Sequence, residues 1–148
     1  MGLPKLTFTL KKAARTVAAR TSQSVVALII RDSKANGVHA IYQESDIPST
    51  LGADNAAYIK RAMIGHINRP SVVYVSVIAA AAEIATGFSA LANYSYDYLC
   101  GPVDISAADA TALAALVKAQ RKLRYIGKAV LPNTAADDEG GINFVSSG

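Results

Sequence analysis

Strand patterns alternate with helix patterns along most of this chain, and no other feature limits its possible folds as much. Four runs rich in β-branched or aromatic residues are typical of strands: SVVALIIRD (24–32), SVVYVSVI (71–78), YDYLCGPV (96–103) and YIGKAVLP (125–132). Because strands that alternate with helices form parallel sheets joined by right-handed crossovers, we predict an α/β fold, in which helices flank a largely parallel sheet.

Three segments between these strands predict helices. They are residues 53–67, 79–94 and 106–124, in which apolar residues recur every three or four positions. Asp54 stands near the start of the first helix and is placed to cap it. Ser106 and Asp109 have the spacing of a capping box at the start of the third helix, and bases gather near its carboxyl end, where the helix dipole favours them.

A turn signal follows the first strand pattern. SKANG, residues 33–37, contains Asn36 and Gly37, which both tolerate positive φ, and VHAIYQ (38–43) then returns to a strand pattern. We therefore predict a β-hairpin formed by residues 24–32 and 38–43.

Positive charge is concentrated at the amino end. Residues 1–31 carry six bases and no acid, whereas residues 32–148 carry nine bases and eleven acids. Within the basic segment KLTFTL (5–10) alternates between apolar residues and threonine, which is the pattern of a half-buried strand. Such a segment suits nucleic acid, an anionic membrane or an acidic protein surface, and charge alone does not choose among them.

The amino-terminal strand pattern gains little by ordering on its own. Fixing six residues costs roughly 6–12 kcal/mol of backbone entropy, and burying Leu6, Phe8 and Leu10 returns about 5–9 kcal/mol. We therefore predict that residues 1–21 form an extended arm that adds to another subunit's sheet, and that residues 22–148 form the α/β domain. The alternative is an edge strand of the chain's own domain. Phe8 is the only aromatic residue among the first 31, which argues against nucleic-acid binding by stacked bases.

Composition favours a folded protein of a reducing compartment. Apolar residues make up 51% of the chain and charged residues 18%, and the single cysteine, Cys100, permits no internal disulfide. The longest apolar run, residues 72–82, is too short to cross a membrane, and the amino end lacks the apolar core of a secretory signal. We expect folding in a cytoplasm without membrane insertion.

The sequence offers little catalytic chemistry. It has no dinucleotide or phosphate-binding glycine pattern, no GxSxG elbow and no HExxH motif. His39 and His66 lack a metal-ligand partner at helical spacing, and Cys100 has no histidine beside it, so we interpret all three as structural. We predict no catalytic residue, no cofactor and no metal site.

One loop is rich in carboxylates. KAVLPNTAADDEGGINF (128–144) leaves a strand pattern, passes through Asp137, Asp138 and Glu139, and becomes apolar again after two glycines. Adjacent acids favour a solvated or partner-facing turn, because Ca²⁺ loops draw ligands from alternate positions. The alternative is a small metal-dependent α/β enzyme that uses these three acids.

Three blocks of the sequence resemble the sheath proteins of contractile phage tails, especially those of phages and prophages of Gram-positive bacteria. In chain order the blocks are MGLPKLTFTLKKAARTVAARTSQSVVALIIRD (1–32), SDIPSTLGADNAAYIKRAMIG (45–65) and KAVLPNTAADDEGGINF (128–144). The resemblance extends over essentially the whole chain, and the last block is the most specific. It implies that the acidic loop belongs to a virion structural protein and not to an enzyme.

The resemblance also implies an assembly and its partners. Sheath subunits form stacked hexameric rings around a tail tube and contract on a baseplate signal, which drives the tube through the cell envelope for genome ejection. The implied partners are neighbouring sheath subunits, tube proteins and baseplate proteins, without direct contact to nucleic acid. The implied location is the virion tail, after assembly in the bacterial host cytoplasm. The arm that ties neighbouring subunits would comprise Lys5, Leu6, Thr7, Phe8, Thr9, Leu10, Lys11, Lys12 and Arg15.

The length of the chain differs from that of the family. Sheath proteins commonly contain several hundred residues, whereas this sequence has 148. We therefore expect it to correspond to the amino-terminal portion of a sheath protein, with the family's carboxyl-terminal region absent.

Overall fold

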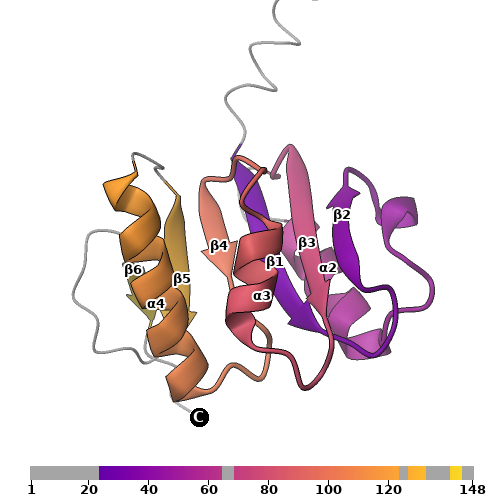
Figure 1. Cartoon of the computed structure of the whole chain (residues 1–148). Coiled ribbons are helices and arrows are strands. Elements are labelled where there is room, and N and C mark those ends of the chain that lie inside the picture. Colours follow the sequence, from indigo (N-terminus) through magenta and orange to yellow (C-terminus); the bar gives the residue numbers. More distant parts are fainter. Residues whose placement is uncertain (1–23, 65–68, 124–126, 133–140, 145–148) are drawn as a thin grey trace, which may run out of the picture.

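The computed structural model describes residues 24–64, 69–123, 127–132 and 141–144. Its elements are β1 (Val25–Arg31), β2 (Gly37–Ile41), the short 3₁₀ helix η1 (Glu44–Asp46), α2 (Ala53–Ile64), β3 (Val72–Ile78), α3 (Ile84–Ala90), β4 (Tyr98–Cys100), α4 (Ala107–Lys122), β5 (Lys128–Pro132) and β6 (Gly141–Phe144). These strands form one sheet in the order β2-β3-β1-β4-β5-β6 (Figure 1). Every neighbouring pair is parallel except β2 with β3. The predicted α/β fold with a largely parallel sheet is confirmed.

Strand β1 lies at the centre of the sheet and is paired along both edges. It is in register with β3 from Val25↔Val72 to Arg31↔Ile78, and with β4 over a shorter stretch. Its side chains alternate between two cores: Ala27 and Ile29 enter one, and Leu28 and Ile30 enter the other. A continuous apolar run is what a strand buried on both faces requires.

Helices cover the two faces of the sheet unequally. Figure 1 shows α3 and α4 on one face and α2 on the other, behind the half of the sheet that contains β1, β3 and β2. Leu91, Leu113 and Val117 from the α3–α4 side pack in the first core, and Ile59 of α2 packs in the second. The predicted helices are thus present, although α3 is shorter than the pattern over residues 79–94 indicated.

The predicted hairpin of residues 24–32 and 38–43 is wrong. Strand β2 pairs with β3, from Gly37↔Val77 to Ile41↔Val73, and β3 lies between β1 and β2. The turn does reverse the chain, but it spans two strand spacings, about 10 Å. Strand β3 takes the place next to β1 because it offers β1 a longer and more fully buried partner than β2 does.

The turn itself also differs from the prediction in one residue. Positive φ occurs at Ala35 (58°) and at Gly37 (119°), and not at Asn36. Glycine adopts the conformation at residue 37 without the steric cost that a Cβ would add.

Gly87 allows α3 to lie close against the sheet. A Cβ built at this buried position would lie 2.6 Å from Ile29 Cγ2 and 3.1 Å from Ile78 Cγ2. We expect Gly87→Ala to lower the free energy of unfolding by about 1–2 kcal/mol, because overpacking outweighs the better helix propensity of alanine.

Urea denaturation measures this effect. Ser89→Ala, at an exposed position of the same helix, is the matched control and should remain within about 0.5 kcal/mol of the parent chain. A Gly87→Ala variant as stable as the parent would contradict the close approach of α3.

Candidate functional site

The strand order identifies where a doubly wound sheet would carry a site. The chain leaves β1 toward β3 by way of α2 on one face, and it leaves β4 toward β5 by way of α4 on the other face. The direction of winding therefore changes between β1 and β4. Ligands of such folds bind beyond the carboxyl ends of the strands at this switch point.

Arg31, the last residue of β1, joins three segments on the α3–α4 side of the switch point. Its Nη1 donates to Asp109 Oδ2 at 3.0 Å, and its Nη2 donates to the carbonyl oxygen of Ala82 at 3.4 Å. Only 19% of the Arg31 side chain and 23% of the Asp109 side chain are exposed, so solvent screens this ion pair less than a surface pair. The hydrogen bond from Arg31 lowers the pKa of the Asp109 carboxyl.

Asp109 lies in the first turn of α4, where the predicted cap is confirmed. Ser106 is the N-cap, and its Oγ accepts a hydrogen bond from the Asp109 N–H at 3.1 Å. A carboxylate in this turn also interacts favourably with the helix dipole. The local sequence therefore places Asp109 where Arg31 can reach it.

Asp32, the next residue, holds α2 on the opposite side of the sheet. Its Oδ2 accepts from Gly52 N and from Asn55 Nδ2, both at 2.9 Å, and its Oδ1 accepts from Lys34 N at 3.1 Å. The hydrogen bond from Gly52, followed by those from Asn55 and Lys34, lowers the pKa of Asp32.

Asp54 was the wrong choice for the cap of α2. The helix begins at Ala53, so Asp54 lies inside the first turn. The Gly52 N–H at the start of the helix is satisfied instead by Asp32, twenty residues earlier in the chain. A cap supplied by another element has no local sequence signal.

Tyr58 of α2 packs against the second core and reaches the segment that follows β4. Its hydroxyl donates to the carbonyl oxygen of Gly101, just beyond β4, at 3.0 Å. Burial raises the pKa of Tyr58. A Cβ at Gly101 would lie 2.5 Å from Ile105 Cδ1, so this corner is already filled. Apart from Arg31 Nε, which is buried without a hydrogen-bond partner among the described residues, these groups satisfy one another. Their arrangement can fix α2, α4 and the loop before α3 to the sheet.

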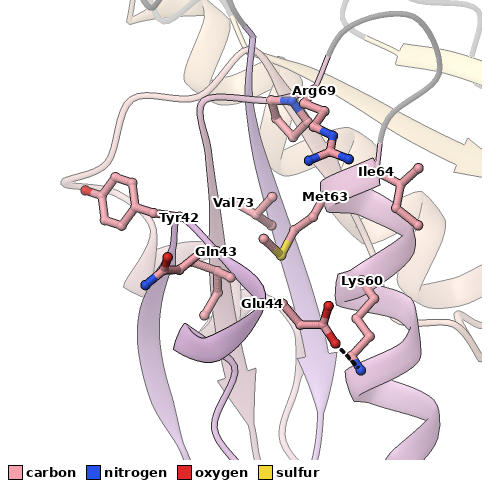
Figure 2. A pocket seen from close by; sticks show the side chains of 10 residues that line it. Tyr42, Gln43, Glu44, Lys60, Met63, Ile64, Arg69 and Val73 are labelled. Atoms are coloured by element: carbon pink, nitrogen blue, oxygen red, sulfur yellow. Dashed lines mark ion pairs between the residues drawn. The ribbon is translucent and has the colours of Figure 1, made fainter.

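A groove lies at the opposite end of the sheet, beside the amino end of β3. It has a volume of about 340 Å³ and is lined by Ile41, Tyr42, Gln43, Glu44, Lys60, Met63, Ile64, Arg69, Pro70 and Val73. Figure 2 shows it between the η1 segment and the carboxyl end of α2, with the Glu44–Lys60 ion pair across one end and Arg69 at the other. Its wall is mainly apolar and its rim is charged.

The residues predicted for assembly lie outside the described part of the chain. This holds for the arm residues between Lys5 and Arg15 and for the acidic loop residues Asp137, Asp138 and Glu139. His66 also lies outside it. Residues Arg31, Asp32 and Asn55 were missed by sequence reasoning, and the only available signal was a polar pair at the end of an apolar strand.

His39 and Cys100, which the sequence indicates to be structural, lie in surroundings that agree with that interpretation. The ring of His39 lies 2.7 Å, through Nε2, from the carbonyl oxygen of Ala35 in the preceding turn. Burial raises the pKa of the Cys100 thiol to about 11, which disfavours the reactive thiolate.

Two features are absent from the part of the chain that the structure describes. Within residues 24–64, 69–123, 127–132 and 141–144, no three His, Cys, Asp or Glu side chains are grouped to hold a metal ion. In the same part of the chain, no helix combines the length and apolar character needed to cross a bilayer.

Together these features define a doubly wound α/β domain whose switch point is filled by its own polar side chains. No protein-family model matches the chain. The chain is similar to the tail sheath protein of Clostridium phage phiCD119, with 30% identity over 151 aligned positions. The alignment includes 99% of this chain and 42% of that protein, so the chain spans less than half the length of this curated relative. The resemblance to phage tail sheath proteins predicted from the sequence is confirmed.

Proposed function

We propose that this chain is a structural subunit of a phage tail sheath and corresponds to the amino-terminal portion of a full-length sheath protein. The observation that carries the proposal is the 30% identity to a tail sheath protein across 99% of the chain. The proposed location is the virion tail, after assembly in the host cytoplasm. The proposed partners are other sheath subunits, then tube and baseplate proteins, in hexameric rings that contract for genome ejection.

The polar network at the switch point supports a mechanical role. Arg31 and Asp32 are adjacent in sequence, yet they fix helices on opposite faces of one sheet. A subunit that moves during contraction transmits force best when its layers move together. We propose that the network gives the domain this rigidity and that the chain is not an enzyme.

The acidic loop and the arm belong to this proposal as assembly segments. Residues 1–21 would connect neighbouring subunits as an extended arm, residues 22–148 would form the sheath domain, and Asp137, Asp138 and Glu139 would face a partner. No observation favours the metal-dependent enzyme considered as the alternative.

Solution mass tests the role of the arm. We expect light scattering to show that the intact chain associates as its concentration rises, and that a chain lacking residues 1–20 remains a folded monomer. Electron microscopy of the associated fractions should show rings or stacks.

Circular dichroism serves as the control that the shortened chain is folded. An intact chain that stays monomeric, and that also fails to sediment with purified sheath of a related phage, would contradict the proposal. Equal association of both chains would remove the arm from it.

A further inference from the structure

A β-turn at the carboxyl end of the sheet presents an apolar residue and an acid to solvent. The N–H of Ile105 donates to the carbonyl oxygen of Pro102 at 3.2 Å, which closes a turn with Val103 and Asp104 at its centre. The Val103 side chain is 63% exposed, and Asp104 is exposed as well. The turn follows β4 directly.

The structure holds this turn in place. Pro102 is buried, and Ile105 packs against the core formed with α3 and α4. Because both ends of the turn are anchored, Val103 and Asp104 project without needing to be ordered on binding, which lowers the entropic cost of a contact. Asp104 forms no hydrogen bond or ion pair within the described part of the chain.

The groove at the other end of the sheet has the complementary character. Its apolar rim residue Ile64 is 61% exposed, and Met63 and Val73 lie deeper in it (Figure 2). Arg69 stands at its mouth, is exposed, and has no ion pair with any residue that the structure describes. The groove can therefore receive an apolar side chain that has a carboxylate beside it.

We propose that the groove of one copy of this chain binds the turn at Val103 and Asp104 of a second copy. Val103 would enter the apolar part of the groove, and Asp104 would pair with Arg69. This inference rests on the proposed function and specifies one contact of the self-assembly.

The position of the two surfaces requires separate copies. The groove is beside Val73, near the start of β3, whereas the turn follows the end of β4. Strands of seven residues separate these two ends by roughly 20 Å. A turn anchored by Pro102 and Ile105 does not cross that distance. The contact therefore joins the carboxyl end of the sheet in one copy to the amino end of the sheet in the next copy.

A contact that joins one surface of a first copy to a different surface of a second copy is heterologous. It leaves one groove and one turn unoccupied at the two ends of each pair. Such contacts propagate, and they form a ring where the rotation closes or an open stack where it does not. This is the type of contact that a sheath built from repeated subunits needs, and a closed two-fold dimer would not supply it.

Charge reversal on the full chain tests the contact. Arg69→Glu and Asp104→Lys should each weaken self-association about tenfold or more, since each places like charges together. The double variant Arg69→Glu/Asp104→Lys should recover association, because the pair is restored with opposite sign. An equal mixture of the two single variants should also associate. Sedimentation velocity across a concentration series measures all four samples.

Matched controls carry the same charge changes outside the contact. Arg61→Glu alters an exposed base of α2 that does not line the groove, and Glu83→Lys alters an exposed acid at the same end of the sheet as Asp104. Both variants should associate like the parent chain when all proteins are compared at 0.5 M salt, which screens their differences in net charge. Val103→Ser provides an uncharged test and should weaken association without affecting the melting temperature.

The outcomes separate this inference from the proposed function. If the parent chain associates and neither reversal weakens it, or if the double variant fails to recover, the proposed contact is overturned while a sheath role stands. If only Arg69→Glu weakens association, the groove binds a different surface and the assignment to Val103 and Asp104 is overturned. If the parent chain does not associate under any condition, the contact is overturned, and the sedimentation test with purified sheath decides the proposed function.

Discussion

Replacing Ile29 with alanine is expected to lower the free energy of unfolding by about 2–5 kcal/mol. Ile29 lies at the centre of β1 with 0% of its side chain exposed, opposite Ser76 of β3 and within the core shared with α3 and α4. Removing three carbon atoms there costs transfer free energy and leaves a cavity, because the strand is fixed on both edges and does not collapse to fill it. Urea denaturation with a fitted slope measures the change.

The control for this substitution is Val103→Ala, which removes two methyl groups at a position that is 63% exposed. It should change the free energy of unfolding by no more than about 0.5 kcal/mol. An Ile29→Ala variant as stable as the control would mean that β1 is not the central strand of the folded protein.

Arg31→Met is expected to lower the free energy of unfolding by about 1–3 kcal/mol. Methionine keeps much of the alkyl packing, but Asp109 and the carbonyl oxygen of Ala82 lose their donor. Asp109→Asn alone should have a smaller effect, because asparagine still accepts from Arg31. In a double-mutant cycle the two substitutions should not add, since they act on one interaction. Additive effects would show that Arg31 and Asp109 are not coupled.

The same network makes the free energy of unfolding depend on pH in the acid range. The pKa values of Asp32 and Asp109 are lowered in the folded protein, so both carboxylates stabilise it fully above their ordinary value near 3.8. That stability is lost as the pH falls below 3.8 and through the folded pKa values. Arg31→Met should weaken the acid dependence contributed by Asp109, because the hydrogen bond from Arg31 is the largest cause of its shift.

Denaturation midpoints measured between pH 2 and pH 6 test this expectation. The parent chain should lose stability below pH 4 more steeply than Arg31→Met does. Parallel pH profiles for the two proteins would contradict the assignment of Arg31 as the group that lowers the pKa of Asp109.

Some parts of the fold were predictable because their signals are local. The apolar runs of β1 and β3, the period of α4 and the Ser106 cap each depend on residues within a few positions of one another, and all are present in the structure. The pairing of β2 was not predictable in this way. The turn at 33–37 specifies that the chain reverses, but not which strand it then joins.

The same difference between local signals and long-range packing applies to the candidate sites. The arm between Lys5 and Arg15 and the acidic loop at 137–139 were recognised from charge and from resemblance, and they remain proposals because they lie outside the described residues. The groove at Arg69 was not recognised, because its members come from segments far apart in the chain. The turn at Val103 is local, but its exposure and its anchoring against the core depend on how the chain packs.

The sequence by itself determined the class of fold, the positions of most helices and strands, and the resemblance to phage tail sheath proteins, because periodicity and motif order are properties of the linear chain. Only the tertiary structure decided that β3 separates β1 from β2, that Asp32 and not Asp54 satisfies the start of α2, and that Arg31 reaches Asp109. Those outcomes depend on which strands bury the most apolar surface together, and that competition among distant segments is settled only when the chain packs.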